Sequence, residues 1–153
     1  MGNKLLNVIK DELWKGASFK EIELGGHKWK LKTLNDGETV WRDKYVQASA
    51  SYSFVTSQRA PTVAVSLIEI DGVPVRDLVL SDDEKSGDFA AAEDWLRVLG
   101  FSSVSERYKV AEKVLEWLQE LPTEIVEELY KVCLELERNR REIMEKVLKK
   151  TLS

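Results

Sequence analysis

The sequence predicts an α+β protein that is mainly α-helical: an N-terminal β-hairpin packed on a small helical domain, with a long C-terminal helix or helical hairpin. Three observations support this fold class. Apolar residues recur at intervals of three and four through the last third of the chain, which is the spacing of one helix face. Apolar and charged residues alternate on both sides of Gly25-Gly26, as in a hairpin. The chain of 153 residues contains only 8 Gly and 3 Pro, the residue types that most disfavour helix.

Chain length limits the domain organisation. A chain of 153 residues can build one hydrophobic core with a helical extension, and it is too short for two full enzyme domains. We divide it into residues 1–102, which hold an N-terminal helix, the hairpin and a helical core, and residues 103–153, which form a C-terminal helical hairpin. We expect the two parts to fold as one unit.

The first expected element is a short amphipathic helix. Asn3 is suited to begin it, because an Asn side chain accepts a hydrogen bond from a free amide of the first turn. Gly16 is suited to end it. The apolar face of this helix consists of Leu5, Leu6, Ile9 and Leu13.

The second expected element is a hairpin over residues 19–34, turned by Gly25-Gly26. Each strand has an apolar face and a charged face, so that Glu on the first strand and Lys on the second can pair in water. The face expected to cover the core consists of Ile22, Leu24, Trp29 and Leu31. The face expected to meet water includes Lys28, Lys30 and Lys32. Two strands alone are marginally stable, so the hairpin must lie on helices or join another sheet.

A second helix is expected from Asn35 or Asp36 to about residue 48, because either side chain is a good N-cap. Its predicted apolar stripe consists of Val40, Trp41, Tyr45 and Ala48. A Ser-rich stretch follows at residues 51–57. For residues 59–70 two interpretations remain open: Val63, Val65 and Leu67 alternate as in a strand, whereas intervals of three and four fit a helix with Pro61 in its first turn. We favour the helix.

Residues 68–75 are predicted to form two short extended pieces around an Asp71-Gly72 turn. Pro74 confines the second piece to the edge of a sheet, since proline has no amide hydrogen to donate. Residues 78–87 are polar and acidic, which is typical of a surface loop. A further helix over residues 89–99 is expected to end at Gly100.

The last third predicts two helices. Ser103 and Glu106 form a capping-box pattern at the start of the first, and Pro122 ends it. Its apolar face consists of Tyr108, Ala111, Val114, Leu115, Leu118 and Leu121. Thr123 begins the last helix, which is expected to reach about residue 149 and to span about 40 Å at 1.5 Å per residue.

No chemical signature marks an active site. His27 lies beside the hairpin turn and is expected to be solvated, and Cys133 falls on an apolar stripe and is expected in the core. One His and one Cys cannot build a structural zinc site, and no glycine-rich phosphate loop is present. The acidic group of residues 82–84 and 88 is expected to be a solvated loop. We therefore expect no catalytic residue, no metal and no cofactor.

Charge and hydropathy exclude two further classes. The net charge is −4 and the pI is about 5.2, whereas nucleic-acid binding depends on clustered basic residues, so no nucleic-acid partner is expected. No run approaches the roughly 18 consecutive apolar residues of a membrane span, so no membrane partner is expected either. With one Cys and no secretory pattern at its start, the chain is expected in the cytoplasm.

The length of the last helix indicates a protein-binding function. A helix of about 40 Å exceeds the roughly 30 Å diameter of a small domain, yet its apolar stripe continues to its far end. Such a stripe needs a cover, which the N-terminal helix, a second copy in a homo-oligomer, or another protein can supply. The candidate partner-binding residues are Leu129, Val132, Leu136, Ile143 and Val147 on the last helix and Leu5, Ile9 and Leu13 on the first.

Three stretches resemble the tail assembly chaperones of tailed bacteriophages. Glu23-Leu-Gly-Gly-His-Lys-Trp-Lys-Leu-Lys-Thr-Leu-Asn-Asp-Gly-Glu38 is similar to the hairpin and helix that open those proteins. Ala64-Val-Ser-Leu-Ile-Glu-Ile-Asp-Gly-Val-Pro-Val75 is similar to their passage of a helix followed by Asp-Gly-Val-Pro. Glu116-Trp-Leu-Gln-Glu-Leu-Pro-Thr-Glu-Ile-Val-Glu-Glu-Leu-Tyr130 resembles the short helix pair that closes them and related baseplate hub components.

This resemblance implies a non-enzymatic protein that binds the tape measure protein, or the growing end of the tail, in the cytoplasm of the infected host cell. The N-terminal helix and the long last helix do not map onto the family. Because of these two helices, a second role is also possible for the protein, that of a permanent structural subunit of the virion tail, baseplate or tail tip. An unrelated helical adaptor or scaffold protein is a further alternative.

Overall fold

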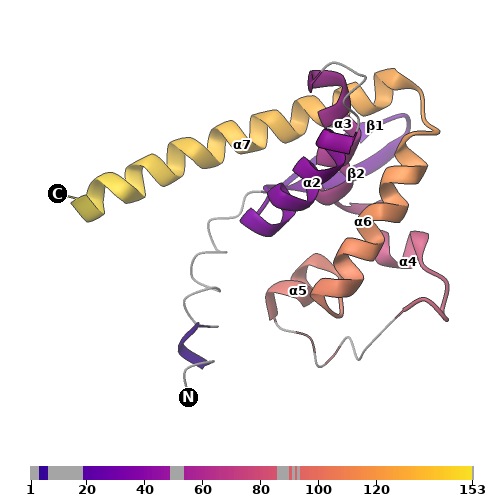
Figure 1. Ribbon diagram of the computed structural model, residues 1–153, viewed down its shortest axis with the longest axis horizontal. Coiled ribbons are helices and arrows are strands. Elements are labelled where there is room, and N and C mark those ends of the chain that lie inside the picture. The colour runs from indigo at the N-terminus through magenta and orange to yellow at the C-terminus, as the bar shows by residue number, and fades with distance from the viewer. Residues whose placement is uncertain are drawn as a thin grey trace.

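The helices and one sheet form a body from which the last helix projects (Figure 1). The structure, a computed structural model, describes residues 4–6, 19–48, 54–85, 90, 92 and 94–152. The predicted α+β fold is confirmed: the described chain is mainly helical, with a four-stranded antiparallel sheet and a long C-terminal helix. Within these residues, no helix combines the length and the apolar content needed to cross a membrane.

The sheet follows the order of the chain, and each strand is antiparallel to its neighbour. Its strands are β1 (Phe19–Leu24), β2 (His27–Lys32), β3 (Leu67–Ile70) and β4 (Val73–Pro74). Both tight turns have positive φ angles, 63° and 83° at Gly25 and Gly26, and 53° and 79° at Asp71 and Gly72. Two successive residues of this kind match the twist of a two-residue hairpin. Both turns lie where the sequence predicted them, and the first hairpin joins a larger sheet.

The helices of the described body are α2 (Asp36–Ala48), α3 (Phe54–Ser66), α4 (Val75–Val79), α5 (Asp94–Leu99), α6 (Val104–Leu118) and α7 (Thr123–Leu152). Residues 59–70 contain both predicted elements in succession, because α3 ends at Ser66 and β3 begins at Leu67. Pro61 lies inside α3 rather than in its first turn. On α2, Val40 is exposed and Val46 is buried, so the apolar face differs from the predicted stripe.

Helix α3 lies at the centre of the body and contacts α2, α6, α7, β2 and β3. Helices α6 and α7 leave the turn at Pro122 in different directions, and each packs on α3 (Figure 1). The core therefore draws on both predicted parts of the chain. Its fully buried apolar side chains include Leu31, Val63, Leu67, Ile68, Val110, Val114, Leu118 and Leu129.

The predicted orientation of the hairpin is correct for most residues and wrong for one. Trp29 and Leu31 are buried, and Lys28 is exposed, as expected. Lys32, which was expected in water, is only 1% exposed. The end of β2 is covered on both faces, because the apolar core encloses one side and Glu38 of α2 binds the lysine on the other. Alternation along a strand cannot reveal a second covered face.

Candidate protein-binding site

Three of the eight residues predicted to bind a partner belong to the chain's own core. Leu129, Val132 and Leu136 are buried and join the main apolar cluster. Their helix, α7, packs on α3 and on strands β1 and β2. The structure places these three residues in the core instead of on an exposed surface, because one stripe serves both halves of the helix, and helical spacing does not show where the chain's own core stops.

The other predicted residues have different outcomes. Ile143 is 46% exposed, and Leu5 is also exposed. Val147 lies in α7, and its side chain is not among those described. Ile9 and Leu13 lie outside the described residues. Ile143 is thus the described candidate on α7 that offers apolar surface to a partner.

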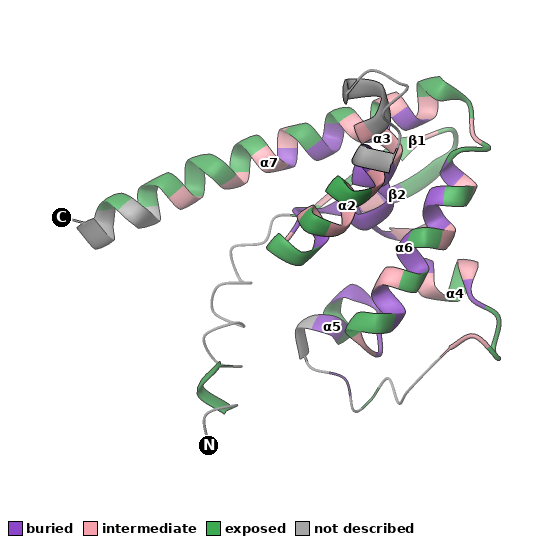
Figure 2. Ribbon diagram, in the orientation of Figure 1, coloured by how far each residue is buried: buried purple, intermediate pink, exposed green. Residues whose placement is uncertain are grey.

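The distal part of α7, residues 138–152, is the arm. Beyond Leu136, none of the α7 side chains that the structure describes is buried (Figure 2). Two hydrogen bonds hold the root of the arm to the body: the Leu34 amide donates to Glu137 Oε1 at 2.9 Å, and Arg140 donates from Nη1 to the Leu34 carbonyl oxygen. The arm therefore starts at a fixed point and extends away from the body (Figure 1).

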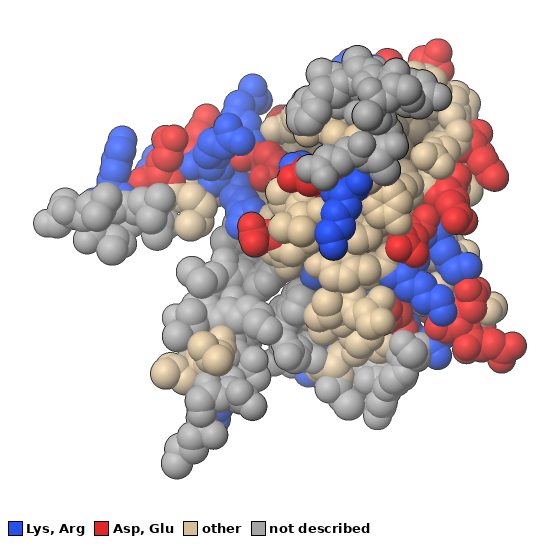
Figure 3. All heavy atoms as spheres, in the orientation of Figure 1, with Lys and Arg blue, Asp and Glu red and all other residues tan. Residues whose placement is uncertain are grey.

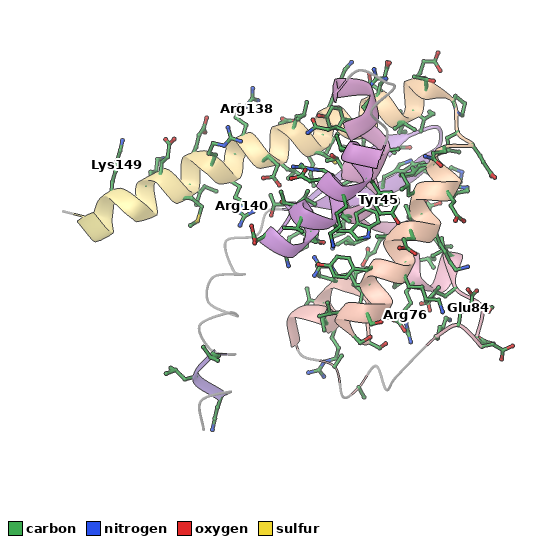
Figure 4. All side chains as sticks on the ribbon, viewed as in Figure 1. Tyr45, Arg76, Glu84, Arg138, Arg140 and Lys149 are labelled. Carbon is green, nitrogen blue, oxygen red and sulfur yellow. The ribbon has the colours of Figure 1, made fainter. Side chains whose placement is uncertain are left out.

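The arm is basic and amphipathic. Residues 138–150 include six basic and two acidic side chains, although the whole chain has 23 basic and 27 acidic ones. Arg138, Arg140 and Lys149 mark its length in Figure 4. Ile143 and Val147 are four residues apart, so they share one helix face and continue the apolar stripe of the core. An apolar stripe between basic residues is a surface suited to a helix-binding groove.

A hollow surface, which we call the groove, lies between the sheet and helices α4 and α6, with a volume of about 720 Å³. Clefts of about 300–1,000 Å³ are typical of ligand sites. The rings of Trp29 and Trp117, which line it, stack with centroids 5.9 Å apart. Most of the residues that line the groove are apolar. Besides the two Trp, they are Leu67, Ile70, Val73, Val75, Leu78, Val79 and Val114.

The charged side chains at the groove that make no ion pair with a described residue are acidic. Lys113 is paired with Glu84 at 2.7 Å, and this hydrogen bond is the main reason that the pKa of Glu84 falls to about 2. Glu116 and Glu120 are exposed, and within the described part of the chain neither makes an ion pair. The charged or titratable side chains that line the groove are His27, Asp71, Lys113, Glu116 and Glu120.

His27 has a structural role at the edge of the groove. Its Nδ1 lies 2.5 Å from Asp71 Oδ2, and the Lys28 amide donates to Asp71 Oδ1 at 2.8 Å. The hydrogen bond from Lys28, followed by that from His27, lowers the pKa of Asp71. These contacts tie the β1–β2 turn to the β3–β4 turn, so the two hairpin tips form one wall of the groove.

Three charged side chains form a buried cluster where β2, α2 and α6 meet. Lys32, Glu38 and Arg107 are 1%, 0% and 3% exposed. Lys32 Nζ lies 2.6 Å from both carboxylate oxygens of Glu38, and Arg107 pairs with the same carboxylate. Two cations therefore share one buried anion.

Burial dominates the titration of this cluster. Burial, followed by the charge of Arg107, holds the pKa of Lys32 well below its usual value, and burial lowers the pKa of Arg107 to about 10. Glu38 also closes the start of α2: the Asn35 amide donates to its Oε1 at 2.9 Å, and its own amide donates to Asn35 Oδ1 at 2.9 Å. The carboxylate is thus committed to the fold.

The lone thiol is not placed for chemistry. Cys133 is buried, and burial raises its pKa to about 12. A protonated thiol is a poor nucleophile and a poor metal ligand. In the described ranges, no group of three or more His, Cys, Asp or Glu side chains is placed to hold a metal ion.

Comparison with protein-family models, with curated proteins and with solved structures finds no match.

Sequence reasoning missed the groove and its acidic rim. Its lining comes from both hairpin tips, from α4 and from α6, so no local pattern marks it. The one available signal was the pair Glu116 and Glu120, four residues apart and thus on one side of a helical segment that also carries Trp117. That pattern alone is equally typical of a solvated helix face.

Proposed function

We propose that this protein acts by binding other proteins through its arm and performs no catalysis. The observation that carries the proposal is the apolar stripe beyond Leu136, where Ile143 is 46% exposed and Met144 is half-buried. Covering apolar surface contributes about 25 cal/mol per Å², less the cost of ordering the partners. A helix that carries such a stripe away from its own core is available to a partner.

The chemistry of the body supports a binding role. The thiol of Cys133 is enclosed, His27 is engaged with Asp71, and Glu38 is shared by two cations and a helix cap. Each of these groups has a role in holding the fold. The exposed apolar and charged surfaces of the arm and groove are what the described chain offers to other molecules.

Within this class we propose a role in phage tail assembly, in which the protein engages the tape measure protein or the growing tail in the host cytoplasm. The resemblance of residues 23–38 and 64–75 to tail assembly chaperones supports this assignment. A permanent structural subunit of the virion tail or baseplate is the alternative. An unrelated helical adaptor or scaffold protein is the further one.

Co-purification tests this function. The tagged full-length chain is co-expressed with the products of the genes that neighbour its own, and retained proteins are identified. We expect Ile143→Asp with Val147→Asp to reduce retention at least tenfold. The matched control is Leu134→Asp with Val98→Asp, which places the same charges at two exposed apolar positions away from the stripe. The control should retain the partner as the wild type does.

The identity of the retained protein separates the alternatives. A long coiled-coil protein supports the assembly chaperone, tube or baseplate proteins support the structural subunit, and a retained protein of another kind supports the adaptor. Equal retention by the wild type, the stripe variant and the control would show that the arm is not the binding surface.

A further inference from the structure

The arm and the groove are complementary in charge. Arg141 and Lys146 are exposed on the arm. Lys146 lies three residues after Ile143, and Arg141 lies three residues before Met144, so the two basic residues lie on opposite sides of the stripe. The groove presents Glu116 and Glu120 without ion-pair partners in the described chain. Basic side chains stand along the arm in Figure 3, whereas acidic side chains gather on the side of the body that faces away from it.

The two surfaces also match in shape and hydropathy. The arm is an exposed amphipathic helix, and the groove is an apolar hollow in the size range of ligand clefts. An amphipathic helix that lays its apolar face in an apolar groove is a recurring mode of protein recognition. The apolar side chains of the stripe would insert beside Trp29 and Trp117, with basic side chains left at the acidic rim.

The arm cannot occupy the groove of its own chain. Helix α7 begins at Thr123, just after Glu120 of the rim, and continues without a break to Leu152. At 1.5 Å per residue, Ile143 lies about 30 Å along this helix from its start. The stripe is thus carried away from the groove, and a return would require the helix to break.

We propose that the arm of one copy docks in the groove of a second copy of this chain. This inference rests on the proposed function, since it gives the same protein-binding stripe a second copy of this chain as a further partner. The contact joins two different surfaces, so it builds open chains or closed rings, the smallest ring being a pair in which each arm fills the other copy's groove. Since opposite charges flank the contact, added salt weakens it.

Sedimentation of the full-length chain over a concentration series tests the proposal. We expect the wild type to associate reversibly and to dissociate as salt is raised. Glu116→Lys with Glu120→Lys disables the groove, and Ile143→Asp with Val147→Asp disables the arm. Each of these two variants alone should stay monomeric. The control is Asp83→Lys with Glu124→Lys, which makes the same charge change at exposed sites elsewhere. The control should associate as the wild type does.

A mixture of the two disabled variants gives the sharpest result. The groove variant retains an intact arm, and the arm variant retains an intact groove, so an equimolar mixture should form a one-to-one complex and nothing larger. Association of the groove variant at wild-type strength, with no complex specific to the mixture, would indicate that arms pair with one another, and it would overturn the proposal.

A wild type that stays monomeric at every concentration would also overturn the proposal. If the wild type then still retained a different protein through its stripe in the co-purification assay, the proposed function would stand without this partner. If neither self-association nor retention of another protein depended on the stripe, the proposed function and the proposed docking of a second copy would both be wrong.

Discussion

At the residue scale, Glu38 is the side chain on which the buried charges depend. We predict that Glu38→Gln lowers the free energy of unfolding by about 3–5 kcal/mol, because it removes the negative charge of the buried carboxylate that Lys32 and Arg107 share. Glutamine keeps the volume and an acceptor for the Asn35 amide, so the change isolates the charge. Chemical denaturation measures the loss.

Lys32→Met is the matched control for that prediction. It removes one cation and leaves Glu38 paired with Arg107, so the remaining cluster is neutral and the loss of stability should be smaller. If Lys32→Met destabilised the protein as much as Glu38→Gln, shared charge would not be the reason for the cluster.

A second prediction concerns Cys133. Because burial raises its pKa to about 12, native protein at pH 8 should react with iodoacetamide only as fast as the chain unfolds, so labelling should follow the denaturant unfolding curve. An unfolded thiol loses its proton from about pH 9, whereas the buried thiol retains it. The contribution of the buried, protonated thiol to the free energy of unfolding is therefore fully present below about pH 9 and is lost as the pH rises toward about 12. Fast labelling without denaturant would contradict this.

The buried position of Lys32 could not be predicted at this scale. Its alternation with Trp29 and Leu31 is typical of a wet strand face. Its partner Glu38 lies six residues along the chain in α2, and the same carboxylate binds Arg107 of α6, which is distant in sequence. Cys133 could be predicted, because an apolar stripe on both sides of it in sequence indicated the core.

At the element scale, local capping chemistry determined where α6 begins. Ser103 Oγ accepts a hydrogen bond from the Glu106 amide at 3.1 Å, whereas Glu106 uses its own carboxylate to bind the Ser102 amide at 3.1 Å and to pair with Arg76. The predicted capping box is therefore half formed. The serine half satisfies one of the free amides of the first turn.

We predict that Ser103→Ala lowers the free energy of unfolding by about 1 kcal/mol, because it removes that cap. Ser105→Ala is the control, since Ser105 is an exposed residue in the first turn of the same helix, and it should change stability little. Equal losses in the two variants, measured by denaturant unfolding, would argue against the cap.

Elements whose ends are marked by turn or capping residues in the sequence were predicted, and elements held in place by contacts with distant residues were not. Both two-residue turns and the start of α7 at Thr123 have such signals. Helix α4 has none: it spans five residues, begins after Pro74 without a side-chain cap, and packs on α6 and β3. Its residues were therefore read partly as an extended piece and partly as loop.

At the scale of the whole molecule, the division into body and arm follows from one continuous apolar stripe on α7. The stripe and the length of the helix were visible in the sequence. The point at which the core stops was not, because it depends on α3 and on strands β1 and β2, which cover α7 only as far as Leu136. The groove was hidden for the same reason, since its residues meet only when the sheet packs near α6.

We propose that the stripe on the arm serves a partner and not the fold. Unfolding of dilute protein by denaturant tests it most directly, with Ile143→Asp plus Val147→Asp compared against the wild type and against Leu129→Ala. Leu129 is fully buried, so Leu129→Ala should lower the free energy of unfolding by about 2–5 kcal/mol. The stripe variant should unfold within about 0.5 kcal/mol of the wild type, as surface changes do. A loss comparable to that of Leu129→Ala would show that the stripe belongs to the core and that the arm is no binding surface.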